Sequence, residues 1–226
     1  MSLFGAAALL LATGPAAPAA PVKPAAQAPE RSPRAYGPAV PKQARTVALT
    51  FDDGPSRYTP QILAVLRRHH VHATFCMLGD EARRYPELAR QVVAEGHQVC
   101  NHSRDHANLQ KASTAKVRAE VTKAQKQIKK ATEVTPKVFR FPYGASDSQA
   151  RKVVHGYGLR VLGWNVDPED WTRPPAKKIT TRITAHVKNG SVVLMHDGGG
   201  DRSHTAASLE ATITRLRARG YTFVLA

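Results

Sequence analysis

An apolar run meets two adjacent carboxylates and a turn in the stretch Val47-Ala48-Leu49-Thr50-Phe51-Asp52-Asp53-Gly54-Pro55. Valine, leucine, threonine and phenylalanine favour a β-strand, and the Gly-Pro pair cannot continue one. Asp52 and Asp53 are therefore predicted at the C-terminal end of a strand, where α/β proteins place their functional residues. Neighbouring carboxylates repel each other, so a cation or hydrogen bonds must hold them; the alternative is that this stretch is only a turn.

Short runs of strand-forming residues alternate with stretches of helical periodicity along the rest of the chain. The predicted strands are 46–51, 73–78, 98–101, 138–140, 159–164, 191–195 and 221–225. The predicted helices are 60–69, 86–95, 114–132, 147–155, 176–187 and 203–219. Strand followed by helix, repeated, predicts parallel strands with right-handed crossovers. Seven repeats indicate an α/β barrel resembling a shortened (β/α)8 barrel, with an open doubly wound sheet as the alternative.

The longest predicted helix, 114–132, is amphipathic. Val117, Val121, Ala124, Ile128 and Ala131 follow one another at steps of three or four residues and are predicted to be buried. The opposite face is rich in lysine. Such a face could meet a nucleic acid or a membrane, but solvated lysines on a surface helix are the commoner case, and we predict no function for it.

The length of 226 residues and the 42% hydrophobic composition suit one globular domain of catalytic size. The formal net charge of the chain is +16. Of the 33 basic and 17 acidic residues, 28 and 16 follow Arg45, so the segment after Arg45 has a net charge of +12. An anionic cell-wall polymer as partner, or solubility alone, would explain this charge. The basic residues are spread over several segments without a nucleic-acid-binding motif, so we expect no nucleic acid partner.

Residues 1–20 are predicted to be a signal segment, because an apolar run over 3–12 is followed by small residues and prolines. The run is too short to span a bilayer, and cleavage would fall before Ala17. The positively charged start of a signal peptide is missing. Either the start codon is assigned too far downstream, or the segment is an uncleaved Ala-rich tail and not a signal. Residues 21–44 are predicted to be a Pro/Ala-rich linker and 45–226 the folded domain, with no membrane span elsewhere.

The two cysteines fall on consecutive predicted strands, Cys76 on the second and Cys100 on the third. Consecutive strands are usually neighbours, so the two residues are expected to lie close together. In an exported protein they could form a disulfide, whereas in a cytosolic protein both would be small buried hydrophobic residues. Neither is expected to act as a nucleophile.

Two histidines follow the third predicted strand in the segment 101–106, which reads NHSRDH. The i, i+4 spacing predicts that the imidazoles of His102 and His106 lie on one side of a helical turn. With one carboxylate they would supply three protein ligands to a metal ion and leave positions open for water or substrate. A lone histidine would more often be structural.

Three further predicted strands also end in polar residues. Arg140 ends the fourth strand and can clamp a carboxylate, the segment 164–171 after the fifth carries acids and two tryptophans suited to holding a sugar ring, and His196 follows the sixth. Polar groups thus collect at five strand ends on one face of the predicted barrel. Random placement would scatter them over both faces, so the pattern indicates an enzyme.

With these residues in view, the chain resembles the polysaccharide deacetylases of carbohydrate esterase family 4, the NodB-type domain. Five motifs carry the resemblance in the family's order: TFDDGP at 50–55, HSRDH at 102–106, RFPY at 140–143, DPEDW at 167–171 and LMH at 194–196. The resemblance covers about residues 45–226. It implies a distorted (β/α)7 barrel, a divalent metal ion that is usually Zn2+, with Co2+ or another ion as alternatives, and hydrolysis of acetyl groups on a polysaccharide.

The resemblance also assigns roles to residues at the matching positions. The metal ligands would be Asp53, His102 and His106. Asp52 would be the general base that accepts a proton from water, and His196 the general acid that protonates the departing group. Proton transfers of this kind typically contribute about 10²–10⁴-fold each.

Five more residues receive supporting roles from the same resemblance. Arg140 would orient the base and keep it ionised, and Asp170 would hold the imidazole of the acid in its protonated form. Tyr143 would offer its backbone N–H to the developing oxyanion. Trp171 and Leu194 would wall the pocket for the acetyl methyl group.

The leading prediction is a secreted or cell-wall-associated, monomeric enzyme that deacetylates an N-acetylglucosamine polymer, either peptidoglycan or chitin. An acetylxylan esterase of the same fold is the alternative, because the motifs describe acetyl removal and not the sugar. A non-catalytic glycan-binding module is the alternative from another class. The presence of a base and an acid argues against such a module, because binding alone requires neither.

Overall fold

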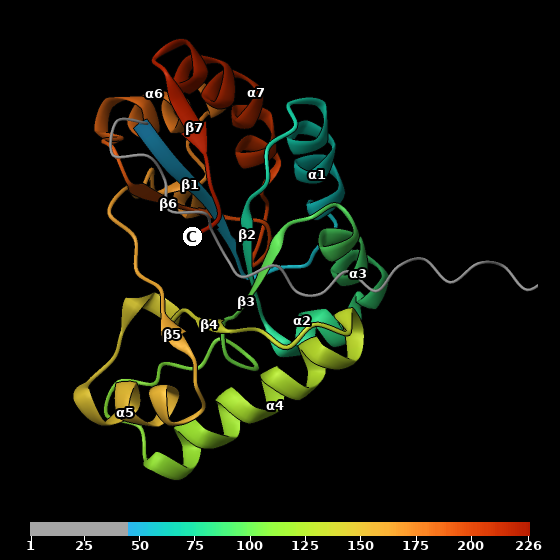
Figure 1. The fold of residues 1–226 in the computed structure, drawn as a ribbon, viewed down its shortest axis with the longest axis vertical. Coiled ribbons are helices and arrows are strands. Elements are labelled where there is room, and N and C mark those ends of the chain that lie inside the picture. The colour runs from blue at the N-terminus through green and yellow to red at the C-terminus, as the bar shows by residue number, and fades with distance from the viewer. Residues whose placement is uncertain (1–44) are drawn as a thin grey trace, which may run out of the picture. The chain divides into compact units, whose positions relative to one another are not determined.

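The computed structural model describes residues 45–226, and the predicted signal segment (1–20) and linker (21–44) lie outside the described residues. Within the described part, no helix combines the length and the apolar character needed to cross a membrane. Strands and helices alternate along this part of the chain, as the sequence predicts (Figure 1).

All strands in the described chain belong to one parallel sheet, in the order β5-β4-β3-β2-β1-β6, with β7 paired to the start of β1. Each corresponds to a predicted strand. β1 is buried over nearly its whole length between its neighbours, the environment that favours an unbroken apolar run. The strands are β1 (Arg45–Asp52), β2 (Thr74–Met77), β3 (Gln98–Asn101), β4 (Val138–Phe139), β5 (Arg160–Val161), β6 (Ser191–His196) and β7 (Tyr221–Phe223).

The sheet forms a distorted barrel. Strands β2 to β5 add to one side of β1 in chain order and β6 lies on its other side, which is the order of a barrel and not of a doubly wound sheet. Within residues 45–226 no continuous ladder joins β5 to β6. A single bridge between Val166 and Val193 spans this gap, where the Leu194 N–H donates to the Val166 carbonyl at 2.9 Å. The expected distorted (β/α)7 barrel is confirmed.

The helices of the described chain follow the predicted pattern with one addition, α2. Its six residues bury only Gly79 and Ala82, too few to produce a helical periodicity in the sequence. The α-helices are α1 (Thr59–Arg68), α2 (Gly79–Arg84), α3 (Pro86–Ala94), α4 (Thr114–Thr132), α5 (Ser148–Gly156), α6 (Ala176–His186) and α7 (Ser203–Ala218), and two short 3-10 turns are η1 (Pro142–Gly144) and η2 (Asp170–Thr172).

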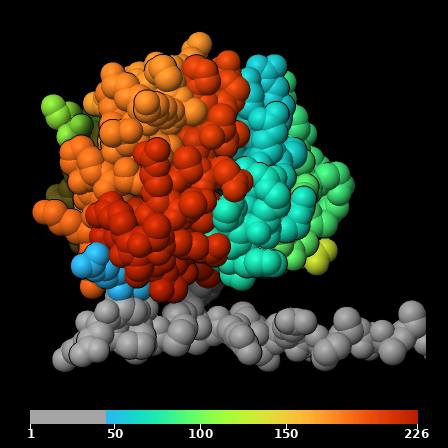
Figure 2. Space-filling model, turned by 90° about the horizontal axis from the view of Figure 1, so that it is seen from above, coloured from blue at the N-terminus to red at the C-terminus, as the bar shows by residue number. Residues whose placement is uncertain are grey.

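The apolar face predicted for α4 is buried, which confirms the pattern at 117, 121, 124, 128 and 131. Ser113 caps the helix by accepting the Lys116 N–H at 3.2 Å. At the other end of the chain α7 packs against both α6 and α1. Figure 2 shows the C-terminal segment in red between the orange segment that contains α6 and the blue-green segment that contains α1.

Cys76 in β2 and Cys100 in β3 are direct partners in the strand ladder and form a disulfide, with 4.2 Å between their Cα atoms. The sequence left open whether the two cysteines form a disulfide or are separate buried residues, and the structure has the disulfide. The bond joins the two strands immediately before Asn101 and His102, so it stiffens the base of the segment that carries the paired histidines.

Candidate active site

The register of the parallel strands decides which polar residues meet. Asp52 ends β1 directly opposite His196, which ends β6. Asn101 ends β3 opposite Phe139 of β4, so the residues that follow these strands emerge at the same edge. The predicted site residues therefore collect at the C-terminal end of the barrel, where (β/α) barrels carry their active sites.

Three side chains converge at this edge in an arrangement suited to a metal ion. Asp53, His102 and His106 each offer a ligand atom, and these atoms lie within 4.8 Å of one another. Asp53 Oδ1 is 3.5 Å from His102 Nε2 and 3.4 Å from His106 Nε2. This Oδ1 is buried and accepts no hydrogen bond within residues 45–226, which is costly unless a cation balances it. Two imidazoles and a carboxylate are a recurrent ligand set of catalytic zinc sites.

Both imidazoles are prepared for ligation. His102 Nδ1–H donates to the Arg140 carbonyl at 2.8 Å, which fixes the ring and leaves Nε2 free to bind. Burial, helped by the charge of His102 and opposed by that of Asp53, lowers the pKa of His106. A neutral imidazole is the form that binds a metal ion.

The segment that carries the two histidines is not helical, so the predicted helical turn is wrong. Ser103 and His106 have φ values of 70° and 67°, and no helix is present between β3 and α4. Side chains shape the loop instead. Asn101 Oδ1 accepts the Ser103 N–H at 2.9 Å, Ser103 Oγ accepts the His106 N–H at 3.1 Å, and the buried Glu120 accepts the Arg104 N–H at 3.0 Å.

Asp52 is buried and is held through one of its two oxygens. Arg140 Nη1 donates to Asp52 Oδ1 at 2.8 Å, while Asp52 Oδ2 lies 3.6 Å from His102 Nε2. Arg140 is fully buried and also donates to Thr50 Oγ1 at 2.7 Å and to the Gly163 carbonyl at 3.2 Å. The guanidinium is thus fixed from three directions and orients the carboxylate.

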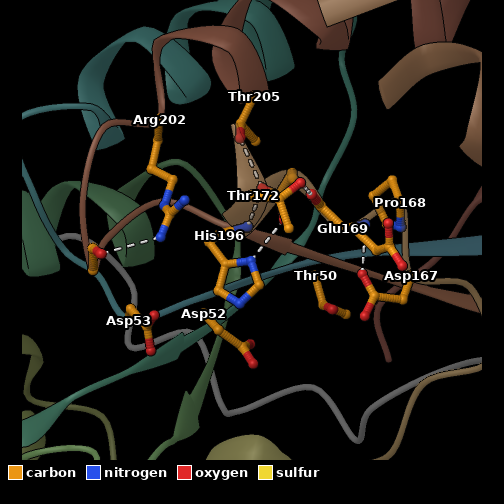
Figure 3. A network of polar contacts seen from close by, with 12 residues as sticks. Thr50, Asp52, Asp53, Asp167, Pro168, Glu169, Thr172, His196, Arg202 and Thr205 are labelled. Carbon is orange, nitrogen blue, oxygen red and sulfur yellow. Dashed lines mark hydrogen bonds and ion pairs between the residues drawn. The ribbon is translucent and has the colours of Figure 1, made fainter. Parts of the chain in front are cut away.

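His196 is paired with a buried carboxylate. Its Nδ1 lies 2.7 Å from Asp170 Oδ1, and its backbone N–H donates to Asp170 Oδ2 at 2.9 Å. Burial disfavours the charged imidazole, but the hydrogen bond and charge of Asp170, with the charges of Asp52 and Asp53, outweigh it and raise the pKa of His196 to about 9. Figure 3 shows the His196 ring directed toward Asp52.

A cavity of about 410 Å3 opens between these groups and is lined by eight of the ten predicted site residues. The other two, Arg140 and Asp170, lie behind Asp52 and His196. Three lining residues are additional to those predicted: Phe141, Trp164 and Asp167. The sequence could have identified these three residues, because each lies within or beside one of the motifs.

Aromatic side chains form the mouth of the cavity. Tyr143 and Trp171 are 67% and 53% exposed, whereas Leu194 is buried at its wall. The Tyr143 ring lies 4.4 Å from the His106 ring, between centroids. The φ of Tyr143 is 60°, a left-handed conformation that a non-glycine residue keeps only where its surroundings enforce it.

A model of the protein family described as polysaccharide deacetylase matches residues 39–162. The chain belongs to the polysaccharide deacetylase family. The candidate metal ligands, the Asp52–Arg140 pair and the oxyanion candidate Tyr143 all lie within the matched range. His196 and Asp170 lie beyond it and are placed in the site by the fold.

Individual members of the polysaccharide deacetylase family cover most of the described chain. The chain is 43% identical over 190 residues to the peptidoglycan-N-acetylglucosamine deacetylase PgdA of Listeria monocytogenes, a match that covers 83% of this chain and 40% of that protein. It therefore spans less than half the length of this relative. It is 40% identical over 178 residues to a chitooligosaccharide deacetylase of Bradyrhizobium, covering 76% and 81% of the two chains.

A solved structure shows the same fold. The Bc1960 peptidoglycan N-acetylglucosamine deacetylase has a TM-score of 0.79 and 34% identity to this chain, and the match covers 82% of this chain and 87% of that one.

Proposed function

We propose that the chain is a metal-dependent hydrolase that removes acetyl groups from N-acetylglucosamine units of a polymer, peptidoglycan or chitin. One observation carries the proposal: the Asp52 carboxylate and the His196 imidazole line the same cavity as the three candidate metal ligands. A glycan-binding module would need neither a base nor an acid, so this arrangement favours an enzyme.

Asp53, His102 and His106 would hold the metal ion, and this assignment is supported by Asp53 Oδ1, which has no hydrogen-bond partner in the described part of the chain. When bound, a divalent ion such as Zn2+ supplies Lewis-acid polarisation of an acetyl carbonyl and of a water molecule. Co2+ or another divalent ion fits the same ligands.

Asp52 would accept the proton of the attacking water through Oδ2. Its Oδ1 is taken by Arg140, so Oδ2 is the oxygen available to a proton, and it faces the His102 side of the cavity. Arg140 is held by Thr50 and Gly163 as well as by Asp52, so its role would be to orient Asp52. This arrangement supports Asp52 as the general base.

His196 would donate its proton to the departing amine. Because Nδ1 is bound to Asp170, Nε2 is the ring nitrogen left to face the substrate. With a pKa raised to about 9, the imidazole is charged at neutral pH and carries the proton that the leaving group needs. Asp52 would thus take up one proton from water, and His196 would deliver one proton to the leaving amine.

The acetyl group would enter between the aromatic mouth and the wall of the cavity. The backbone N–H of Tyr143 would stabilise the oxyanion, and Trp171 and Leu194 would enclose the methyl group. The exposed faces of Tyr143 and Trp171 suit the apolar face of a sugar ring.

The substrate class follows from the relatives, which are named for peptidoglycan and for chitooligosaccharides. Both contain N-acetylglucosamine, so we infer amide hydrolysis in preference to the O-deacetylation of an acetylxylan esterase. Action on peptidoglycan would place the protein outside the membrane, at the cell wall or secreted. We expect it to act as a monomer.

The two acids of the opening motif provide the test. Asp52→Asn keeps the side-chain volume but loses the proton acceptor, so zinc should stay bound while kcat falls roughly 10²–10⁴-fold. Asp53→Asn replaces an anionic ligand with a neutral one, which should weaken zinc affinity first. The measurement is acetate release from an N-acetylchitooligosaccharide during a zinc titration of both variants and the parent.

Added zinc should restore part of the rate to Asp53→Asn and none to Asp52→Asn. Rescue of Asp52→Asn alone would reverse the two roles. Full activity in both variants would show that the opening stretch is only a turn and would remove the proposed mechanism.

A further inference from the structure

Arg202, at the start of α7, is a buried guanidinium with an unusual set of partners. It is 4% exposed, and it donates from Nε to the Gly198 carbonyl at 2.6 Å and from Nη2 to the Gly199 carbonyl at 3.1 Å. Both of these partners are backbone carbonyls and neither is a carboxylate, and within residues 45–226 Nη1 has no hydrogen-bond partner. A buried charge is costly to keep, so the two carbonyl contacts call for an explanation.

The loop that Arg202 holds is pressed against Asp53. A Cβ atom at Gly198 would lie 2.1 Å from the Asp53 carbonyl oxygen, and one at Gly199 would lie 2.5 Å from Asp53 Oδ2. The Gly198 N–H also donates to the Asp52 carbonyl at 3.2 Å. Gly198 therefore packs against the backbone of Asp53 and Gly199 against its carboxylate, and Arg202 holds both glycines through their carbonyl groups.

Thr205, one helical turn further along, contacts the other half of the site. It is 1% exposed, and its Oγ1 donates to Asp170 Oδ2 at 2.7 Å. Asp170 Oδ2 also accepts the His196 backbone N–H, while Oδ1 faces His196 Nδ1. The hydrogen bond from Thr205 helps to keep the Asp170 carboxylate from rotating away from the imidazole, and removing Thr205 would lose that restraint.

We propose that Arg202 and Thr205 are positioning residues with separate duties. Arg202 sets the metal ligand Asp53 through the Gly198–Gly199 backbone, and Thr205 sets the acid His196 through Asp170. Figure 3 shows both side chains extending from the start of α7 toward the site. α7 is itself packed between α6 and α1, so a rigid helix holds both halves. The roles assigned to Asp53 and His196 rest on the proposed function.

The test is a crossover between two variants, Arg202→Met and Thr205→Val, read first by zinc affinity without substrate. Arg202→Met should bind zinc about 10–100-fold more weakly in competition with a chromophoric chelator, the usual effect of losing a residue that orients a ligand. Thr205→Val should bind zinc as the parent does. Thr212→Val is the matched control, because Thr212 is a buried threonine of α7 whose hydrogen bonds go to Ser208 and Thr180.

The second reading is catalytic and should show the opposite order. At saturating zinc, Thr205→Val should lower kcat for acetate release about 10–100-fold with little change in KM, and Thr205→Ser, which keeps the hydroxyl, should recover most of it. Arg202→Met should regain activity as zinc is raised. Thr212→Val should leave both readings unchanged even if it lowers the melting temperature.

A third measurement, by proton NMR, tests the role of Thr205 even if the parent protein releases no acetate. In the metal-free protein the low-field Nδ1–H resonance of His196 should be visible in the parent and in Thr205→Ser, and should broaden in Thr205→Val through faster exchange with water. The zinc and resonance readings need no substrate, so failure of the proposed function and failure of this inference are distinguishable.

The inference is overturned if Arg202→Met binds zinc as tightly as the parent, since a merely structural arginine would lower only stability. It is also overturned if Thr205→Val weakens zinc binding as much as Arg202→Met, or if Thr205→Val leaves both kcat and the His196 resonance intact. If Arg202→Met does not fold, Arg202→Lys retains the charge with different donor geometry. Parental zinc affinity in that folded variant would likewise contradict the assigned duty.

Discussion

At the scale of single residues, the charge of Asp170 decides whether His196 carries a proton. Burial alone would lower the pKa of His196, and the hydrogen bond and charge of Asp170 are the main effects that raise it to about 9, with smaller help from Asp52 and Asp53. We expect Asp170→Asn to lower that pKa, so that a smaller fraction of the imidazole is protonated at pH 8. Activity there should fall roughly 10²–10⁴-fold, and the alkaline limb of the pH profile should move to lower pH.

The measurement is kcat/KM against pH for parent and Asp170→Asn, together with a proton NMR titration of His196. A raised pKa means that the acid form persists as pH rises to about 9 in the parent and is lost earlier in the variant. An unchanged alkaline limb in Asp170→Asn would exclude His196 as the acid that this carboxylate supports.

Residues that lie in the motifs were predictable from the sequence, including Arg140 and Asp170, which act through Asp52 and His196. Supporting residues outside the motifs were not. Asp52, His102 and His196 follow strand-forming runs, so their position at the strand ends follows from the pattern. Arg202 and Thr205 lie beyond the last predicted motif. Their importance depends on partners that only the folded chain brings near, such as Asp170, 35 residues from Thr205.

At the scale of elements, the disulfide between β2 and β3 is the feature with the clearest energetic consequence. It joins cysteines separated by 24 residues, a loop for which restriction of the unfolded chain is worth about 2–4 kcal/mol in the chain-entropy model. Reduction of the parent, or the double substitution of Cys76 and Cys100 by alanine, should therefore lower the free energy of unfolding by about that amount. The candidate metal site should be loosened with it, since His102 follows β3 directly.

Denaturant unfolding with and without reductant measures this contribution, and the alanine double variant, which should be insensitive to reductant, is the control. A thiol titration of the denatured parent, purified after export and without reductant, should find no free thiol. Two reactive thiols under those conditions, or identical stability with and without reductant, would show that the bond contributes nothing.

The elements also show where reasoning from sequence ends. Long amphipathic α4 and buried β1 follow from periodicity and composition alone. The loop between β3 and α4 does not, because the i, i+4 histidine spacing suggests a helical turn. Positive φ values at Ser103 and His106, stabilised by side-chain hydrogen bonds that include Asn101 and Glu120, bring the imidazoles together without a helix.

At the scale of the whole molecule, the order of strands around the barrel turns scattered motifs into one site. β6 returns to the free side of β1, so His196 meets Asp52 although 144 positions separate them along the chain. β3 and β4 place His102 and Arg140 at the same edge. Because all parallel strands present their C-terminal ends together, the barrel gathers the five motifs into one cavity.

We propose that this cavity hydrolyses the acetyl amide of N-acetylglucosamine polymers with the help of a metal ion. The most direct measurement is acetate release by the full chain from a panel of peptidoglycan, N-acetylchitooligosaccharides and acetylxylan, each with and without a chelator. We predict release from the first two substrates, its loss with chelator and its return with added zinc. Release from acetylxylan alone, release that chelator leaves unchanged, or no release from any substrate at saturating zinc would exclude the proposed metal-dependent N-deacetylase activity.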